Sequence, residues 1–134
     1  MSSIQIARFI VSFSWLYHGI APKLIQIAPL EKLMTASLGF SEDMSYYITK
    51  SAGVGELLFG LLLFFFYRSK PLLILNILAL IGLLLFVAVL QPQLLFEAFN
   101  PVTTNLGIIG LSMVLLNDLK NDAAKTNLKG QQTQ

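Results

Sequence analysis

Long apolar stretches alternate with short polar segments along the whole chain. The apolar stretches cover about residues 4–27, 45–67, 71–90 and 101–116. Each is close to the roughly 20 residues that an α-helix needs to cross a bilayer, although the last is short. Residues 57–67 are apolar on every side of a helix, which favours contact with lipid over contact with water. The pattern predicts four transmembrane helices.

Helix-capping residues mark the borders of these stretches. Asn100 provides a capping side chain, and Pro101 stands at the first helical position, where its missing N–H costs nothing. Ser41, in front of two acidic residues, indicates another helix start. Between the first two spans, residues 29–38 predict a short surface helix that ends at Gly39.

Composition strengthens the prediction of a membrane protein. Hydrophobic residues make up 55% of the 134 residues and charged residues only 12%, whereas soluble domains carry about 25% charged residues. The mean hydropathy is +0.72. We predict an integral, multi-pass membrane protein with an all-α fold, a transmembrane four-helix bundle over residues 1–119. Residues 120–134 are predicted to form a polar tail.

The same composition excludes several kinds of site. No cysteine is present, which excludes disulfides and thiolate metal ligands. The single histidine cannot supply a multi-histidine metal or haem site within one copy. The sequence has no nucleotide-binding loop, and its scattered net charge of +2 gives no argument for nucleic acid as a partner.

The distribution of basic residues predicts the orientation in the membrane. Four crossings place both termini and the turn between the second and third spans on one side. That side holds most of the basic residues, namely Arg8, Arg68, Lys70, Lys120, Lys125 and Lys129. The other side mixes lysines with acids, namely Lys23, Lys32, Lys50, Glu31, Glu42, Asp43 and Glu97. Because basic residues stay inside, both termini are predicted to be cytoplasmic, in the inner membrane if the cell is bacterial.

Polar residues of three predicted helices then lie at a similar depth beneath the outer surface. A charged side chain deep in a bilayer costs a few kcal/mol, so Glu56 needs a partner, and Lys23 or His18 is nearest in depth. These residues and their polar or aromatic neighbours are the candidates for a ligand-binding pocket: Trp15, His18, Lys23, Glu56, Asn100, Thr104 and Asn105.

Helical spacing indicates which faces meet. Ala52, Glu56 and Gly60 share one face of the second span, and small residues on that face let another helix approach closely. Thr103, Gly107 and Gly110 share a face of the fourth span and are expected to border the same pocket.

A purely structural interpretation competes with the pocket. Glu56 and His18 are equally suited to act as hydrogen-bonded ties between helices. Trp15 lies too deep for the interfacial aromatic belt, but large aromatic residues also fill cores. Arg8 and Asn76 lie toward the cytoplasmic side, where they are expected to pair with each other.

Three sequence elements follow one another in a distinctive order. They are Trp15-Leu-Tyr-His18-Gly19-Ile-Ala-Pro22-Lys23, then Gly53-Val-Gly55-Glu56, then Phe99-Asn100-Pro101-Val-Thr103-Thr-Asn105. In this order and spacing the chain resembles the DoxX-like family of small membrane proteins. The resemblance implies a four-helix membrane bundle. It also implies a link to respiratory or redox-stress membrane complexes, with which members of the broader group are associated.

Three hypotheses for function stay open. The first is an accessory or anchor subunit of a membrane redox system, with a redox partner protein and a pocket that binds a quinone or a lipid-like molecule. In it, His18 and Lys23 donate hydrogen bonds to a carbonyl or an anionic head, and Glu56 orients one of them. The second is a structural or assembly protein that acts through a partner or a second copy. The third is a small transporter or proton-conducting unit, because buried carboxylates mark proton paths.

Overall fold

The computed structural model is all-helical over the residues that it describes, which are 1–98 and 100–132, with the side chains of 127 and 129–132 left aside. The elements, in chain order, are α1 (Ser3–Gly19), a π-helical segment η1 (Ile20–Ile25), α2 (Pro29–Ser37), α3 (Glu42–Phe65), α4 (Lys70–Leu90), a 3₁₀ turn η2 (Pro92–Phe96) and α5 (Pro101–Gln132). No strand occurs in these ranges, so the predicted all-α class is confirmed. Phe99, quoted above in the third sequence element, lies outside the described residues.

Local capping explains where several helices begin and end. The Ser41 side chain accepts a hydrogen bond from the Met44 N–H at the start of α3, and Asn100 Oδ1 accepts one from the Thr103 N–H at the start of α5. Gly39, at φ 78°, follows α2, in the left-handed conformation that glycine adopts without strain. These ends agree with the capping pattern in the sequence.

Within the described residues, three helices are long and apolar enough to cross a membrane: α3, α4 and the Pro101–Thr126 part of α5. Only 22% of the most apolar window of each is buried inside the molecule, so most of their apolar surface faces outward. Helix α1 is shorter, but η1 continues it without a break. Helix α5 continues to Gln132, into the segment expected to be a polar tail.

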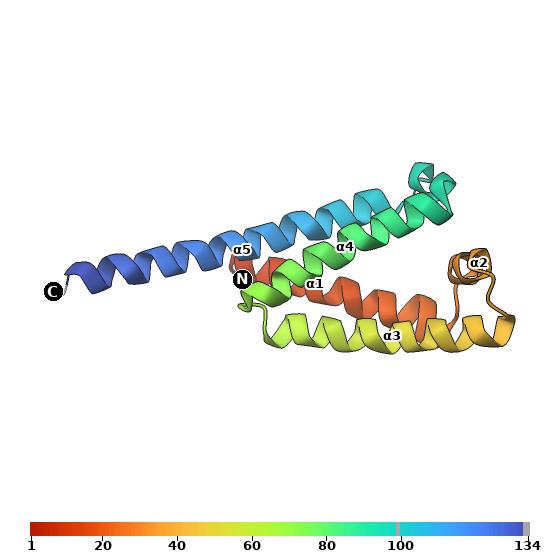
Figure 1. The fold of residues 1–134 in the computed structure, drawn as a ribbon. Coiled ribbons are helices and arrows are strands. Elements are labelled where there is room, and N and C mark those ends of the chain that lie inside the picture. Colours follow the sequence, from red (N-terminus) through yellow and green to blue (C-terminus); the bar gives the residue numbers. More distant parts are fainter. Residues whose placement is uncertain (99, 133–134) are drawn as a thin grey trace.

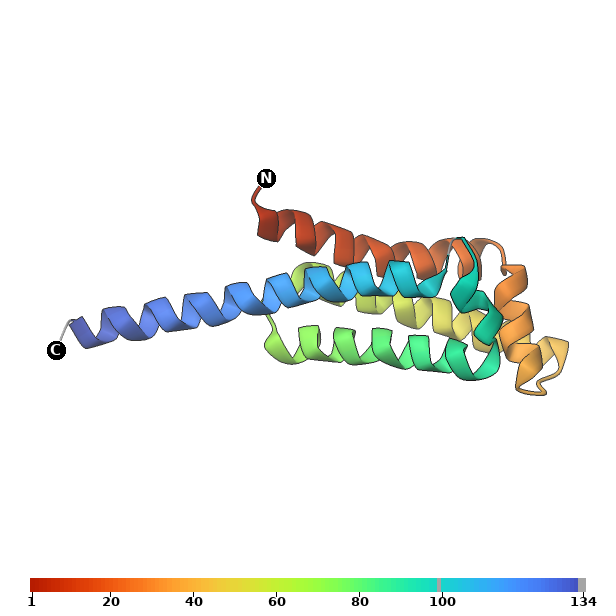
Figure 2. The same cartoon turned by 90° about the horizontal axis from the view of Figure 1, so that it is seen from above.

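The long helices are arranged as two pairs. Helix α1 packs against α3 and against α5, and α5 also packs against α4. Helices α3 and α4 do not pack closely on each other. The α4–α5 pair spreads away from the α1–α3 pair toward the end where α2 lies (Figure 1). At the opposite end, the C-terminal part of α5 extends beyond the other helices (Figure 2).

A small core joins all four long helices. Its buried residues are Ala7, Val11, Trp15, Leu63, Leu73, Leu80, Ile108 and Leu115. Three polar side chains also join the helices there. Trp15 Nε1 donates to Asn76 Oδ1 at 2.6 Å, and Asn76 Nδ2 donates to Ser112 Oγ at 2.7 Å. These two hydrogen bonds tie α1 to α4 and α4 to α5 inside an apolar interior.

The expectation that Arg8 pairs with Asn76 is wrong. Arg8 Nε donates to the Phe64 carbonyl oxygen at 2.7 Å, and its guanidinium carbon lies 4.2 Å from the centre of the Phe64 ring. Its charge therefore meets the carbonyl end of α3, where the helix dipole is negative. Asn76 lies deeper, where Trp15 and Ser112 are its partners.

Candidate functional site

Close packing of α1 on α3 creates the base of the site. A Cβ on Gly19 would lie 2.6 Å from the Gly53 carbonyl oxygen, and one on Gly53 would lie 2.8 Å from the Lys23 Cβ. Gly60 packs in the same way on Leu16, where a Cβ would meet the side chain and backbone at 3.0 Å. Only glycine permits such an approach. The two helices therefore meet closely enough for side chains of one to reach the other.

The segment that follows α1 turns Lys23 into the molecule. From Ile20 to Ile25 the helix widens from α to π, and Pro22 within it has no N–H to continue the ladder of hydrogen bonds. Single π turns are frequent at functional sites. Lys50 Nζ donates to the Leu24 carbonyl at 2.6 Å and so fixes this turn to α3. Lys23 is buried as a result, with 8% of its surface exposed.

Lys23 forms a three-member ion cluster. Its Nζ donates to Glu56 Oε1 at 2.8 Å and to Glu56 Oε2 at 3.0 Å, and it lies 3.0 Å from Glu31 Oε1. The sequence indicated Lys23 or His18 as the partner of Glu56, and the structure assigns Lys23. From the sequence, Glu31 is only one of the mixed charges on the predicted outer side. Its signal was its place in the first turn of α2, soon after Lys23 and on the same predicted side of the membrane.

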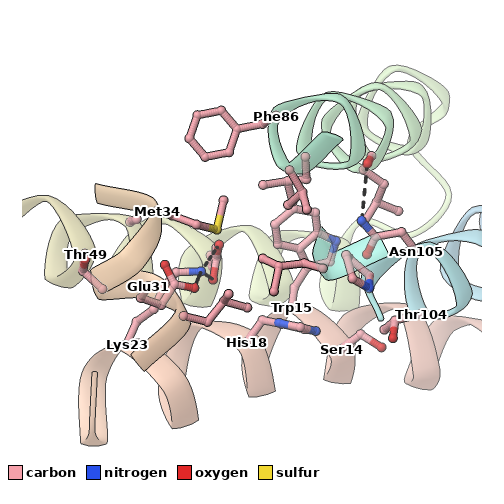
Figure 3. A pocket seen from close by; sticks show the side chains of 18 of the residues that line it. Ser14, Trp15, His18, Lys23, Glu31, Met34, Thr49, Phe86, Thr104 and Asn105 are labelled. Atoms are coloured by element: carbon pink, nitrogen blue, oxygen red, sulfur yellow. Dashed lines mark hydrogen bonds and ion pairs between the residues drawn. The ribbon is translucent and has the colours of Figure 1, made fainter. Parts of the chain in front are cut away.

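A cavity of about 400 Å³ extends from this cluster between the two helix pairs. Helix α2 covers it with Leu30, Met34 and other side chains, and α4 supplies an apolar wall that includes Leu83 and Phe86. Met34 and Phe86 are labelled in Figure 3. All seven residues proposed from the sequence border it: Trp15, His18, Lys23, Glu56, Asn100, Thr104 and Asn105. The structure thus brings the predicted candidates around one space.

The candidates outside the cluster offer few free hydrogen-bond donors to this space. Trp15 presents its ring, which meets the Phe59 ring edge-on at 4.9 Å, because its N–H is bonded to Asn76. Asn105 is buried and its Nδ2 donates to the Leu80 carbonyl at 3.4 Å. His18 is exposed on the side of α1 that borders the cavity. It is the candidate with the most open ring.

Two residues at the start of α5 mainly stabilise the first turn of that helix. Asn100 Nδ2 donates to the Glu97 carbonyl at 2.8 Å, while its Oδ1 caps the helix. Thr104 Oγ1 donates to the Asn100 carbonyl at 3.3 Å. Their side chains border the cavity, but both have partners within the turn.

One face of α5 that was predicted to border the pocket points away from the cavity. Thr103 and Gly107 are exposed, and nothing lies within 4 Å of a Cβ built on Gly107. Thr103, Gly107 and Gly110 are not among the residues that border the cavity, so the expectation that they do is wrong. The face of Ala52 and Glu56 on α3 does border it.

A comparison with known protein families identifies the family of this chain. The sequence model of the DoxX-like family matches residues 12–113. The chain belongs to the DoxX-like family. The matched segment contains every residue that borders the cavity of this DoxX-like protein. The family and the three long apolar helices identify an integral membrane protein. No curated protein and no solved structure matches the chain significantly.

Proposed function

We propose that this DoxX-like protein is an accessory or anchor subunit of a membrane redox system and that its cavity binds a quinone or a similar lipid-like molecule. The redox part of the proposal is supported by the association of the broader DoxX group with respiratory or redox-stress membrane complexes. The binding assignment follows from one observation, a cavity of about 400 Å³ with mostly apolar walls and an ion cluster at one end. Cavities of that size with a few placed polar groups are typical of small-molecule sites.

The proposed membrane arrangement has four crossings, made by α1 with η1, α3, α4 and α5, as a four-helix bundle. The N-terminus, the α3–α4 turn and the protruding part of α5 lie at one end of the molecule (Figure 1). Arg8, Arg68 and Lys70 belong to that end, which supports cytoplasmic termini because basic residues stay inside. The cavity and α2 then lie toward the outer surface.

The arrangement of helices also supports entry from the bilayer. Helices α3 and α4 both border the cavity, yet each packs chiefly on another helix and few contacts join the two. At the α2 end, Gln91 Nε2 donates to Ser37 Oγ at 2.7 Å and links the C-terminal end of α4 to that of α2. A molecule dissolved in lipid would therefore enter sideways, between α3 and α4.

Trp15 gives a direct test of quinone binding, because it is the chain's single tryptophan and borders the cavity. Benzoquinones quench indole fluorescence at short range. Titration of a short-chain benzoquinone into the protein in quinone-free nanodiscs should quench Trp15 with a saturable curve. Ala52→Phe, which fills the cavity from α3, should abolish saturation. Val54→Phe, on an exposed position of the same helix, should leave it unchanged.

The same titration separates the proposal from its rivals. Quenching that rises linearly and equally in Ala52→Phe and Val54→Phe would mean that quinone is only dissolved in the lipid. The cavity would then have no such ligand, and a structural or assembly role would replace it. For the subunit role, cross-linking in native membranes should recover an oxidoreductase component. Recovery of nothing but copies of this chain would contradict it.

A further inference from the structure

The cavity's strongest hydrogen-bond donor is already occupied. The Lys23 ammonium donates to both Glu56 oxygens and lies 3.0 Å from Glu31 Oε1, so two carboxylates meet its charge. The Trp15 N–H is bonded to Asn76 and the Asn105 amide nitrogen to the Leu80 carbonyl. A ligand that can only accept hydrogen bonds therefore finds the exposed His18 ring and a few hydroxyl and amide N–H groups, but not the ammonium group.

Acceptors, in contrast, remain available. An ionised carboxylate has about four sites at which it can accept hydrogen bonds, and Glu56 uses its oxygens for Lys23 alone. Within the described part of the chain, Glu31 Oε2 and Asn105 Oδ1 accept no hydrogen bond. These atoms lie on residues that border the cavity. The polar end of the cavity is thus rich in acceptors.

The net charge of the residues that border the cavity also disfavours an acceptor-only, anionic head. The titratable residues bordering it, among those described, are His18, Lys23, Glu31 and Glu56. With His18 neutral, one positive charge stands against two negative ones. An anionic head placed there would meet a net negative charge where low dielectric strengthens repulsion.

We infer that the cavity selects amphiphiles whose head donates hydrogen bonds and carries no negative charge, a hydroxyl or an amine, over those with a carboxylate or phosphate. This rests on the proposed function, since it names the head of the molecule that the cavity binds. The head meets Glu31 and Glu56, and the apolar chain runs along Leu83 and Phe86 toward the proposed entry between α3 and α4. For a quinone it means that the reduced, dihydroxy form binds more tightly than the oxidised one. It replaces the earlier expectation that Lys23 donates to a carbonyl or an anionic head.

Three probes with the same chain test the inference. Bromododecanol, bromododecylamine and bromododecanoic acid differ only in the head, and their bromine quenches tryptophan fluorescence on contact. Each is titrated into the full chain in nanodiscs while Trp15 emission is followed, with Ala52→Phe used to subtract quenching from the lipid phase. The alcohol and the amine should bind at least about tenfold more tightly than the acid, which corresponds to about 1.4 kcal/mol.

Glu31→Gln is the matched variant, because it removes one negative charge and leaves Glu56 to hold Lys23. It should reduce the preference for amine over acid by about tenfold and leave alcohol binding nearly unchanged. Binding of the acid as tightly as the alcohol, or a preference that Glu31→Gln does not alter, would overturn the inference while the cavity still binds amphiphiles. No saturable quenching by any probe would overturn the proposed function itself.

Discussion

Among single side chains, Asn76 links three helices through its own hydrogen bonds. It is fully buried and bonds Trp15 of α1 and Ser112 of α5 at once. Water cannot replace either partner inside an apolar core, so its loss leaves an indole N–H unpaired. The sequence placed Asn76 near Arg8 by depth alone. Depth did not show which way either side chain points.

Asn76→Leu should therefore lower the free energy of unfolding by about 1–2 kcal/mol. Reversible unfolding in mixed detergent micelles measures the change. Thr103→Val, on an exposed position of α5, is the control and should change stability by less than about 0.5 kcal/mol. Equal effects of the two substitutions would show that the buried hydrogen bonds contribute nothing specific.

Lys23 is the second residue whose removal should be costly. Lys23→Met leaves Glu31 and Glu56 facing each other without a cation and should destabilise the protein by about 3 kcal/mol. Adding Glu56→Gln to it should restore part of that loss, because the repulsion is then removed. A double-mutant cycle from unfolding curves measures the coupling. Strictly additive losses would mean that the ion cluster is not a unit.

At the scale of elements, the close contact of α1 with α3 decides where the ion cluster forms. Gly19→Ala would place a methyl group 2.6 Å from the Gly53 carbonyl oxygen, which is backbone and cannot move aside. We expect a loss of about 2–3 kcal/mol in unfolding free energy, together with a weaker effect of Lys23→Met in that background, since Lys23 no longer reaches Glu56 well.

Gly107→Ala is the matched control for this substitution. Nothing lies within 4 Å of a Cβ at Gly107, and alanine stabilises a helix interior relative to glycine by about 0.5–1 kcal/mol. The two substitutions should therefore have opposite signs in the same unfolding assay. Destabilisation by both would indicate that α5 uses Gly107 to contact something outside this chain.

Helix boundaries and helix faces differed in how well the sequence predicted them. Ser41, Asn100 and Gly39 mark boundaries correctly because capping depends on a few neighbouring residues. The face of Glu56 was predicted because Glu56 shares it with the small residues Ala52 and Gly60 and because a charge facing lipid is costly. The face of Thr103 was not, because small and weakly polar residues are tolerated against lipid as well as against a helix.

The π turn and the contribution of Glu31 depend on packing between elements. Pro22 signals a disturbed helix but not whether it kinks, ends or widens. Glu31 reaches Lys23 only because η1 turns Lys23 inward and α2 folds back over the cavity. Neither event has a local pattern that a single sequence displays.

For the whole molecule, the proposed orientation makes a simple prediction. The chain has no cysteine, so single cysteines at exposed positions report their side of the membrane. Ala36→Cys on α2 should react with an impermeant maleimide in intact cells, and Thr126→Cys on α5 only after permeabilisation. Both positions are exposed. The reverse labelling pattern would place the cavity toward the cytoplasm.

If the ligand enters between α3 and α4 as proposed, the relevant concentration is the one it has in the membrane. A molecule that passes between these helices arrives from the hydrocarbon phase and never needs to dissolve in water. What fills the cavity is then set by the mole fraction of that molecule among the surrounding lipids. Modest affinity suffices when an abundant membrane component is the ligand, and occupancy changes whenever the cell changes its lipid composition.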